Sequence, residues 1–250
     1  MDTEKKFIGI IPARYASTRF PGKPLAELRG KIMVQRVYEQ ASKALDVVFV
    51  ATDDERIFNA VQAFGGNAVM TSANHRSGTD RCAEAVRLVE QDRGDCFDAV
   101  LNIQGDEPFI EPEQLELIKS CFSDERTQIA TLVKLVDNET DLFDPNRPKV
   151  VLNKYSEAIY FSCSTIPYLR GKEIRSWLSS PCHYLHIGLY GFLKKVLFDI
   201  TQLPQSSLEL AESLEQLRWI ENGYRIAVRT TTSESIGIDT PEDLQRMSGE

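Results

Sequence analysis

The chain has little of what metal centres, disulfide frameworks and membrane proteins depend on. Its 250 residues include five cysteines and three histidines, with no C-x-x-C pair and no histidine at zinc-ligand spacing. No apolar run reaches the length of a membrane span, and residues 1–6 pass into the first apolar stretch without a signal-peptide core. We therefore expect free thiols, no membrane partner and a cytoplasmic location.

Positive charge is also scarce. Lysine and arginine number 29 against 37 aspartates and glutamates, which gives a formal net charge of -8. A nucleic-acid binder gains its affinity from neutralising phosphates, so we expect no nucleic-acid partner. The length fits a single α/β domain over residues 1–250, with a sizeable core, rather than two equal domains.

One basic segment departs from the acidic balance. Residues 10–25, IIPARYASTRFPGKPL, follow an apolar run at 7–11 and precede apolar residues at helical spacing. In open α/β sheets, ligands bind beyond the carboxyl ends of the strands, so a loop in this position can line a site. The donors suited to a triphosphate are Arg14, Ser17, Thr18, Arg19, Lys23 and the backbone at Gly22. The segment lacks the spacing of a P-loop or a dinucleotide site, and a solvated loop would also explain its composition.

Apolar strands and segments of helical period alternate along the first half of the chain. Strands are expected at 47–51, 68–70 and 98–103. This alternation predicts right-handed βαβ units, and hence an α/β fold with a doubly wound, mainly parallel sheet. Residues 149–152 and 158–163 instead predict a hairpin. We expect a small antiparallel excursion over 149–192 that supports a dimer.

Two further loops follow expected strands. Residues 74–81, NHRSGTDR, precede a helix for which Thr79 is the expected N-cap, and a capped helix start would explain them without a ligand. Residues 104–108, QGDEP, place Asp106 just past a buried strand. Mg2+ prefers carboxylate and phosphate oxygens, so this is a candidate metal position, although a Gly-Asp turn before proline is also ordinary loop chemistry.

The C-terminal half contains two polar faces. His186, Gly188 and Tyr190 alternate and therefore share one face of an expected strand. Residues 207–219 have helical period, and we expect Leu210, Leu214 and Leu217 on one side and Glu212, Glu215, Gln216 and Trp219 on the other. A tyrosine at the rim of the core and a solvated acidic helix face would explain both patterns without a ligand.

The last motif is GIDTPEDL at residues 237–244. Thr240 is expected to cap a helix that Pro241 begins, so Asp239 stands exposed just before that helix.

Together these segments resemble the 3-deoxy-manno-octulosonate (Kdo) cytidylyltransferase family, the CMP-Kdo synthetases. The resemblance rests on PARYASTRFPGKPL, HRSGTDR, LNIQGDEP and SLELAESLEQLR, and it extends in family order from residue 8 to residue 244. It implies an enzyme that transfers CMP from CTP to the anomeric hydroxyl of Kdo with Mg2+ as cofactor. The products would be pyrophosphate and CMP-Kdo, which supplies lipopolysaccharide synthesis. The resemblance also implies a homodimer.

The resemblance further implies roles for individual residues. The catalytic residues would be Arg14, Lys23, Asp106 and Asp239, with the two aspartates holding Mg2+. The nucleotide-binding residues would be Arg14, Ser17, Arg19, Lys23, Ala51, Thr52, Ser77, Gly78 and Arg81. The sugar-binding residues would be Gln104, His186, Tyr190, Glu215 and Gln216, and the excursion over 149–192 would contribute to that site.

One position departs from the family pattern. After YFS at residues 160–162 the family usually has an arginine that helps to bind the acidic sugar, whereas this chain has Cys163. A thiol supplies neither the charge nor the forked donors of a guanidinium. Either another cation takes over, or the sugar differs, for example an 8-amino analogue of Kdo. The candidate cations are Arg170, Lys172 and Arg175.

Two other functional classes stay open. A nucleotide-binding module without catalysis would keep the sheet, but the complete basic loop together with Asp106 and Asp239 argues against it. A GT-A-type glycosyltransferase also joins a nucleotide-binding sheet to a metal carboxylate. Its usual D-x-D pair is missing at residues 104–106, and release of pyrophosphate would distinguish the two enzymes.

Overall fold

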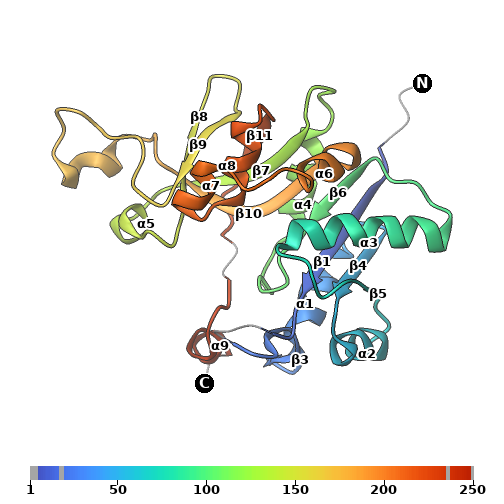
Figure 1. Cartoon of the computed structure of the whole chain (residues 1–250). Coiled ribbons are helices and arrows are strands. Elements are labelled where there is room, and N and C mark those ends of the chain that lie inside the picture. Colours follow the sequence, from blue (N-terminus) through green and yellow to red (C-terminus); the bar gives the residue numbers. More distant parts are fainter. Residues whose placement is uncertain (1–4, 17–19, 235–236, 249–250) are drawn as a thin grey trace. The chain divides into compact units, whose positions relative to one another are not determined.

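The computed structural model describes residues 5–16, 20–234 and 237–248, and the chain separates into two compact units (Figure 1). Unit 1 comprises Met1–Glu116, Gly191–Thr201 and Ser235–Glu250, and unit 2 comprises Leu117–Tyr190 and Gln202–Glu234. The expectation of a single domain over residues 1–250 stays a prediction.

Unit 1 is built on a parallel sheet in the order β6-β1-β4-β5. Its strands are β1 (Phe7–Ala13), β4 (Val48–Thr52), β5 (Ala68–Met70) and β6 (Ala99–Asn102). Ile10 and Ile11 point to opposite faces of β1, and both are fully buried. Both faces of the sheet are therefore covered, as a parallel sheet requires, and the expected mainly parallel sheet is confirmed.

The order of these strands locates a switch point. The chain runs from β1 outward to β4 and β5, and then returns through α3 (Gly78–Arg93) to β6 on the other side of β1. Right-handed crossovers then place α3 on the face opposite the helices that connect the outward strands, and Figure 1 shows α3 crossing in front of β1 and β4. Ligands bind at such a reversal, beyond the carboxyl ends of β1 and β6.

Smaller elements complete unit 1. They are the 3-10 turn η1 (Lys23–Leu25), the two-stranded sheet of β2 (Glu27–Leu28) and β3 (Lys31–Ile32), and the helices α1 (Met33–Ala41), α2 (Glu55–Ala63), α6 (Lys194–Ile200) and α9 (Pro241–Ser248). A small core of Leu28, Met33 and Ile238 packs with Leu244 of α9. This packing ties the C-terminal segment of the unit to the turn that follows the basic loop.

Unit 2 combines parallel and antiparallel strand pairs. Its strands are β7 (Ile129–Leu135), β8 (Lys149–Leu152), β9 (Ala158–Ser162), β10 (Tyr184–Leu193, in unit 2 through Tyr190) and β11 (Ile226–Thr230). β11 is parallel to β7, whereas β8 is antiparallel to both β9 and β10. The hairpin expected around residues 153–157 is confirmed.

The remaining helical elements are α4 (Pro112–Cys121), α5 (Glu139–Phe143), η2 (Ile174–Ser179), α7 (Ser207–Glu212) and α8 (Glu215–Glu221). In the part of the chain that the structure describes, no helix combines the length and the apolar character needed to cross a membrane.

The single helix expected over residues 207–219 is wrong. The chain breaks between α7 and α8 at Ser213, which has the left-handed φ of 56°. The break resets the helical phase, so the expected faces do not form: the side chain of Leu210 is 62% exposed, whereas Gln216 and Trp219 are buried. A period of 3.6 residues continues across such a break in the sequence, and the periodicity alone cannot reveal it.

The expected N-cap at Thr79 is also wrong, by two residues. Ser77 caps α3: its hydroxyl accepts the Asp80 N–H at 3.1 Å, and the Asp80 carboxylate accepts the Ser77 N–H at 3.3 Å. This reciprocal capping box satisfies two backbone donors, which Thr79 within the first turn would not. The expected cap at Thr240 is confirmed, since its hydroxyl accepts the Asp243 N–H at 3.2 Å.

Candidate active site

Two carboxylates that are distant in the sequence meet at one cation in unit 1. The ammonium of Lys23 lies 2.7 Å from Asp106 Oδ2 and 3.2 Å from Asp239 Oδ1. The Ile238 N–H donates to the Asp106 carbonyl at 2.9 Å, which ties the segment bearing Asp239 to the loop after β6. The side chains of Lys23, Asp106 and Asp239 are 15%, 32% and 44% exposed, so ligand and solvent can reach the pair.

A cavity of about 440 Å³ opens beside these groups in unit 1. The end of β1, the turn η1, the start of α3 and the loop after β6 line it, and its charged lining residues are Arg14, Lys23, Arg76 and Asp106. The volume falls in the range of small-molecule sites. Three cations against one carboxylate favour a polyanionic ligand.

Two glycines are required by the backbone around this cavity. A Cβ at Gly105 would lie 2.9 Å from the carbonyl oxygen of Pro12, so only glycine lets the loop after β6 approach the end of β1 this closely. Gly22 has a φ of 73°, and its N–H donates to the Tyr15 carbonyl at 2.9 Å. This contact closes the basic loop and delivers Lys23 to the start of η1.

Arg14 joins the basic loop to the loop before α3. Its Nη2 donates to the carbonyl of His75 and, at 3.3 Å, to the carbonyl of Ser77. The predicted site residues that the structure brings together around the cavity are Arg14, Lys23, Ser77, Gly78, Gln104 and Asp106, with Asp239 reached through Lys23. Ser17 and Arg19, also predicted to bind the nucleotide, lie outside the described residues.

The remaining predicted nucleotide residues are fully buried and do not line this cavity. They are Ala51 and Thr52 at the end of β4, and Arg81 on α3. Arg81 Nη1 donates to Thr71 Oγ1 at 2.6 Å, and Nη2 lies 3.4 Å from Asp53 Oδ2. Burial lowers the pKa of Arg81, although the charge of Asp53 opposes that effect. Sequence reasoning missed Thr71 and Asp53, because neither stands in a recognisable motif.

Four of the predicted sugar-binding residues lie in unit 2, and two of them, His186 and Tyr190, belong to a group of aromatic rings in edge-to-face and tilted contact. The His186 ring lies 5.0 Å from that of Phe161 and 5.2 Å from that of Tyr190, between ring centroids. Tyr190 in turn meets Trp219 of α8 edge to face at 5.1 Å. This packing fixes the rings of His186 and Tyr190. Gln104, the fifth predicted residue, belongs to unit 1.

His186 is an uncharged hydrogen-bonding group. Its Nε2 lies 3.0 Å from Thr131 Oγ1, whose own proton can go to the Leu189 carbonyl at 2.8 Å. We therefore assign the ring proton to Nε2, which leaves Nδ1 as an acceptor. Burial lowers the pKa of His186 to about 3, so the imidazole is neutral at pH 7. Sequence reasoning missed Thr131, which sits within an apolar strand.

Glu215 and Gln216 lie at the start of α8. Glu215 Oε1 accepts from Arg218 Nη2 at 2.7 Å, and Gln216 is buried. The Arg218 contact holds the carboxylate of Glu215 in place next to the buried amide of Gln216.

Cys163 contacts Glu212 rather than a free cation. Its N–H donates to Glu212 Oε2 at 3.0 Å, and the Ser162 hydroxyl donates to Glu212 Oε1 at 2.7 Å. Burial, followed by the charge of Glu212, raises the pKa of the Cys163 thiol, so the thiol is neutral. The charge of Lys149 acts in the opposite direction on that thiol.

Lys149 is a further cation near this segment, because it lies opposite Ser162 in the β8–β9 ladder. It is fully buried, and its Nζ donates to the Asp144 carbonyl at 2.7 Å. The cations named from the sequence, Arg170, Lys172 and Arg175, are exposed instead.

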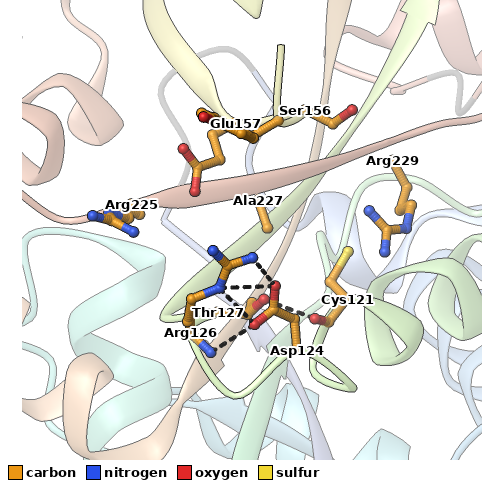
Figure 2. Close-up of a pocket in the computed structure, with 10 residues that line it drawn as sticks. Cys121, Asp124, Arg126, Thr127, Ser156, Glu157, Arg225, Ala227 and Arg229 are labelled. Atoms are coloured by element: carbon orange, nitrogen blue, oxygen red, sulfur yellow. Dashed lines mark hydrogen bonds and ion pairs between the residues drawn. The ribbon is translucent and has the colours of Figure 1, made fainter. Parts of the chain in front are cut away.

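A second cavity, of about 60 Å³, lies within unit 2 (Figure 2). Arg225 and Arg229 lie on opposite sides of Ala227, while Arg126 turns toward Asp124, and three side-chain contacts of 2.7–3.3 Å join that pair. With Glu157, two carboxylates face three arginines, so one positive charge is left over. None of the predicted site residues lines this cavity, so the larger cavity of unit 1 is the better candidate for chemistry.

Comparisons with known proteins agree along nearly the whole chain. The cytidylyltransferase family model matches residues 8–228. The chain is 65% identical to 3-deoxy-manno-octulosonate cytidylyltransferase of Parabacteroides distasonis over 245 residues, which covers 96% of each chain. It is 60% identical to the protein of the same name from Bacteroides thetaiotaomicron over 243 residues, again covering 96% of each.

A solved structure extends the likeness to three dimensions. The structure of CMP:2-keto-3-deoxy-manno-octonic acid synthetase complexed with CTP is similar with a TM-score of 0.88 and 41% identity, and the match covers 98% of this chain and 97% of the other. Identity at this level over whole chains, together with the charged cavity at the switch point, establishes the relationship. This chain belongs to the 3-deoxy-manno-octulosonate cytidylyltransferase family and is a cytidylyltransferase.

Proposed function

We propose that the enzyme transfers CMP from CTP to the anomeric hydroxyl of Kdo and releases pyrophosphate. The observation that carries the proposal is the convergence of Asp106 and Asp239 on one cation beside a cavity rich in positive charge. The relatives named for this activity, at 60–65% identity, support the choice of nucleotide and sugar.

Mg2+ is the proposed cofactor, and the donor set fits it. The ammonium of Lys23 already marks a position that one cation can share between Asp106 and Asp239. Within the described residues no group of three or more histidine, cysteine, aspartate or glutamate side chains forms a closed metal cage. One or two carboxylates completed by phosphate and water oxygens is the usual Mg2+ arrangement. When bound, Mg2+ would neutralise phosphate charge and align an in-line attack.

The basic residues would hold the triphosphate. Arg14 is fixed by two carbonyls at the cavity, and Lys23 can turn from the aspartates to the phosphates, with Ser17 and Arg19 as further proposed donors. Positive groups placed in advance spread the charge that builds on the departing pyrophosphate. Direct attack by the sugar hydroxyl needs no covalent enzyme intermediate.

The cytidine would bind near the carboxyl end of β4 and the start of α3. Arg81 is fully buried there; its Nη2 contacts Asp53 at 3.4 Å, whereas its Nε makes no hydrogen bond among the described residues. A buried guanidinium with an unused donor is costly unless a ligand or water accepts from it. We propose that Arg81 serves the base, with Ala51, Thr52, Ser77 and Gly78 shaping the surrounding surface.

The sugar hydroxyls would be bound by hydrogen-bonding groups, of which only Glu215 is charged. We assign this role to the side chains identified from the sequence, Gln104, His186, Tyr190, Glu215 and Gln216. Cys163 gives specific support to a second candidate, a cytidylyltransferase for another acidic sugar such as 8-amino Kdo. Lys149, which lies opposite Ser162 in the β8–β9 ladder, is a further candidate to replace the family arginine.

A homodimer formed through unit 2 is also part of this proposal. Large apolar side chains are exposed in and around the excursion over 149–192, namely Phe143, Ile159, Tyr168 and Ile174. Phe143 and Tyr168 pack on Trp177, at 6.4 and 5.2 Å between ring centroids, respectively. Grouped exposed apolar side chains favour a protein partner. Light scattering after size exclusion would show twice the 28.3 kDa chain mass if the proposal holds.

The biological setting follows from the product. CMP-Kdo would supply lipopolysaccharide synthesis, and the cytoplasm is the proposed location because the five cysteines are free thiols.

The deciding experiment measures pyrophosphate release by the purified protein with Mg2+ and Kdo, comparing CTP with ATP, GTP and UTP. We expect release with CTP and Kdo. The same assay with 8-amino Kdo tests the second candidate: release with this sugar alone would keep the nucleotide chemistry and change the sugar. Binding of CTP without release for either sugar would overturn both assignments.

A further inference from the structure

Glu84 lies on α3, outside every residue set predicted for the nucleotide, yet its carboxylate holds the loop that precedes the helix. Glu84 Oε2 accepts the Ser72 N–H at 2.7 Å and lies 2.5 Å from His75 Nε2. Ser72 Oγ in turn accepts the Asn74 N–H at 3.1 Å. One carboxylate oxygen therefore fastens both ends of the turn at residues 72–75.

The same turn supports Arg14. The His75 side chain is held by Glu84, and the His75 carbonyl accepts from Arg14 Nη2. The Ser77 carbonyl, at the end of the loop, accepts from the same nitrogen at 3.3 Å. The placement of the Arg14 guanidinium at the cavity thus depends on the position of a loop that Glu84 fixes.

We propose that Glu84 is a positioning residue for nucleotide binding, which acts through His75 to hold Arg14 toward the triphosphate. The inference rests on the proposed function, in which Arg14 binds the triphosphate. Preorganising a donor lowers the cost of ordering it when the ligand arrives.

The charge state of Glu84 suits this task. Burial raises its pKa, but hydrogen bonds from His75 and from the Ser72 backbone outweigh that effect, so its pKa lies below the ordinary value. The side chains of His75 and Glu84 are 19% and 33% exposed, which leaves the contact partly shielded from water. A charged acceptor forms a stronger hydrogen bond than a neutral one.

The other end of α3 offers a matched control. Glu90 Oε1 accepts the Phe97 N–H at 2.8 Å and the Lys194 ammonium at 2.7 Å, so it also clamps a backbone donor and a basic side chain. Neither partner lines the cavity. Loss of Glu90 therefore reproduces the structural cost of losing a carboxylate clamp on this helix without disturbing Arg14.

The test measures the Kd of CTP by calorimetry for Glu84→Ala, Glu84→Gln and Glu90→Ala, each alone and combined with Arg14→Ala. We expect Glu84→Ala to weaken CTP binding about tenfold, which corresponds to about 1.4 kcal/mol. Glu84→Gln keeps an acceptor but loses the charge, so it should recover part of the affinity. Glu90→Ala should lower the melting temperature and leave the Kd unchanged.

The combination with Arg14→Ala decides whether Glu84 acts through Arg14. If it does, Glu84→Ala has no further effect once Arg14 is gone, so the two changes are not additive. Additive losses, or an equal loss of affinity in Glu84→Ala and Glu90→Ala, would overturn the proposal.

Two readouts keep this inference separable from the proposed function. Amide hydrogen exchange at residues 72–77 in the free protein should accelerate in Glu84→Ala and not in Glu90→Ala. Inorganic triphosphate should bind the cavity with the same dependence on Glu84 even if the base is not cytosine. If CTP does not bind but hydrogen exchange and triphosphate binding both depend on Glu84 as expected, only the assignment of the nucleotide is rejected. If hydrogen exchange and triphosphate binding are both unchanged in Glu84→Ala, the role of Glu84 is rejected.

Discussion

The two units prepare their polar groups by different means. In unit 1 the candidate groups are charged and are held by one another and by backbone carbonyls, as Lys23 is by Asp106 and Arg14 is by His75. In unit 2 the two ring-bearing groups are neutral and held by packing, as His186 and Tyr190 are between neighbouring rings, and only Glu215 is held by an ion pair, with Arg218. The difference matches the proposed ligands, a triphosphate for unit 1 and a polyhydroxylated sugar for unit 2.

The contrast also predicts how each unit should fail. A charged site depends on individual groups, so a change of one atom can abolish its chemistry while the fold persists. A packed site depends on volume, so its loss should first appear as lost stability.

The largest expected effect is in unit 1. Asp106→Asn or Asp239→Asn removes a charge from the proposed Mg2+ position without changing the side-chain shape. We expect turnover to fall about a thousandfold, the scale seen when a preorganised electrostatic group is lost from an active site. Pyrophosphate release at limiting Mg2+ measures it, and circular dichroism should show an unchanged fold.

A suitable control is Asp95→Asn, because Asp95 is paired with Arg93 at the end of α3 and does not line the cavity. Its turnover should equal that of the unchanged protein. Normal activity at limiting Mg2+ in Asp106→Asn or in Asp239→Asn would show that the carboxylate changed in that variant does not bind the metal.

The sequence predicts the sheet of unit 1 well because its strands are short apolar runs separated by helices of clear period. The loop residues that meet at the cavity were predictable for the same reason, since parallel strands bring their carboxyl ends to one edge. Two features were not. The partner carbonyls of Arg14 depend on loop geometry, and the bridging of two aspartates by Lys23 depends on contacts between distant segments.

Unit 2 was harder to predict. The hairpin of β8 and β9 was visible as two apolar runs around a polar turn. The faces of residues 207–219 were not, because one left-handed residue, Ser213, changes which side chains are buried. Likewise nothing in the sequence indicates that Thr131, in an apolar strand, accepts a hydrogen bond from His186.

The next largest effect tests packing in unit 2. Trp219 is 1% exposed and meets Tyr190 edge to face, so Trp219→Ala should lower the free energy of unfolding by about 3 to 5 kcal/mol. Leu210→Ala, on the preceding helix, should change it by about 0.5 kcal/mol or less, because that side chain is largely exposed. Urea denaturation measures both. If Leu210→Ala lowers the free energy of unfolding more than Trp219→Ala does, Leu210 is buried, as the continuous helix predicted from the periodicity requires.

The smallest effect tests whether the charged groups of the unit 1 site hold one another in place. Lys23→Gln removes the ammonium that Asp106 and Asp239 share. Without nucleotide, those carboxylates should then bind a divalent cation, measured with Mn2+ in place of Mg2+, about tenfold more tightly. The same variant should bind CTP about tenfold more weakly, because it loses a phosphate donor. Electron paramagnetic resonance of free Mn2+ and calorimetry with CTP measure these opposite changes.

Arg14→Gln separates direct competition from general electrostatics. Arg14 lines the same cavity but donates to carbonyls rather than to the aspartates, so its loss should weaken CTP without strengthening Mn2+. Equal gains in Mn2+ affinity for both variants would mean that the positive field of the cavity, and not occupancy by Lys23, opposes the metal. Unchanged Mn2+ binding in Lys23→Gln would instead place the metal away from Asp106 and Asp239, and the proposed in-line alignment by that pair would fail with it.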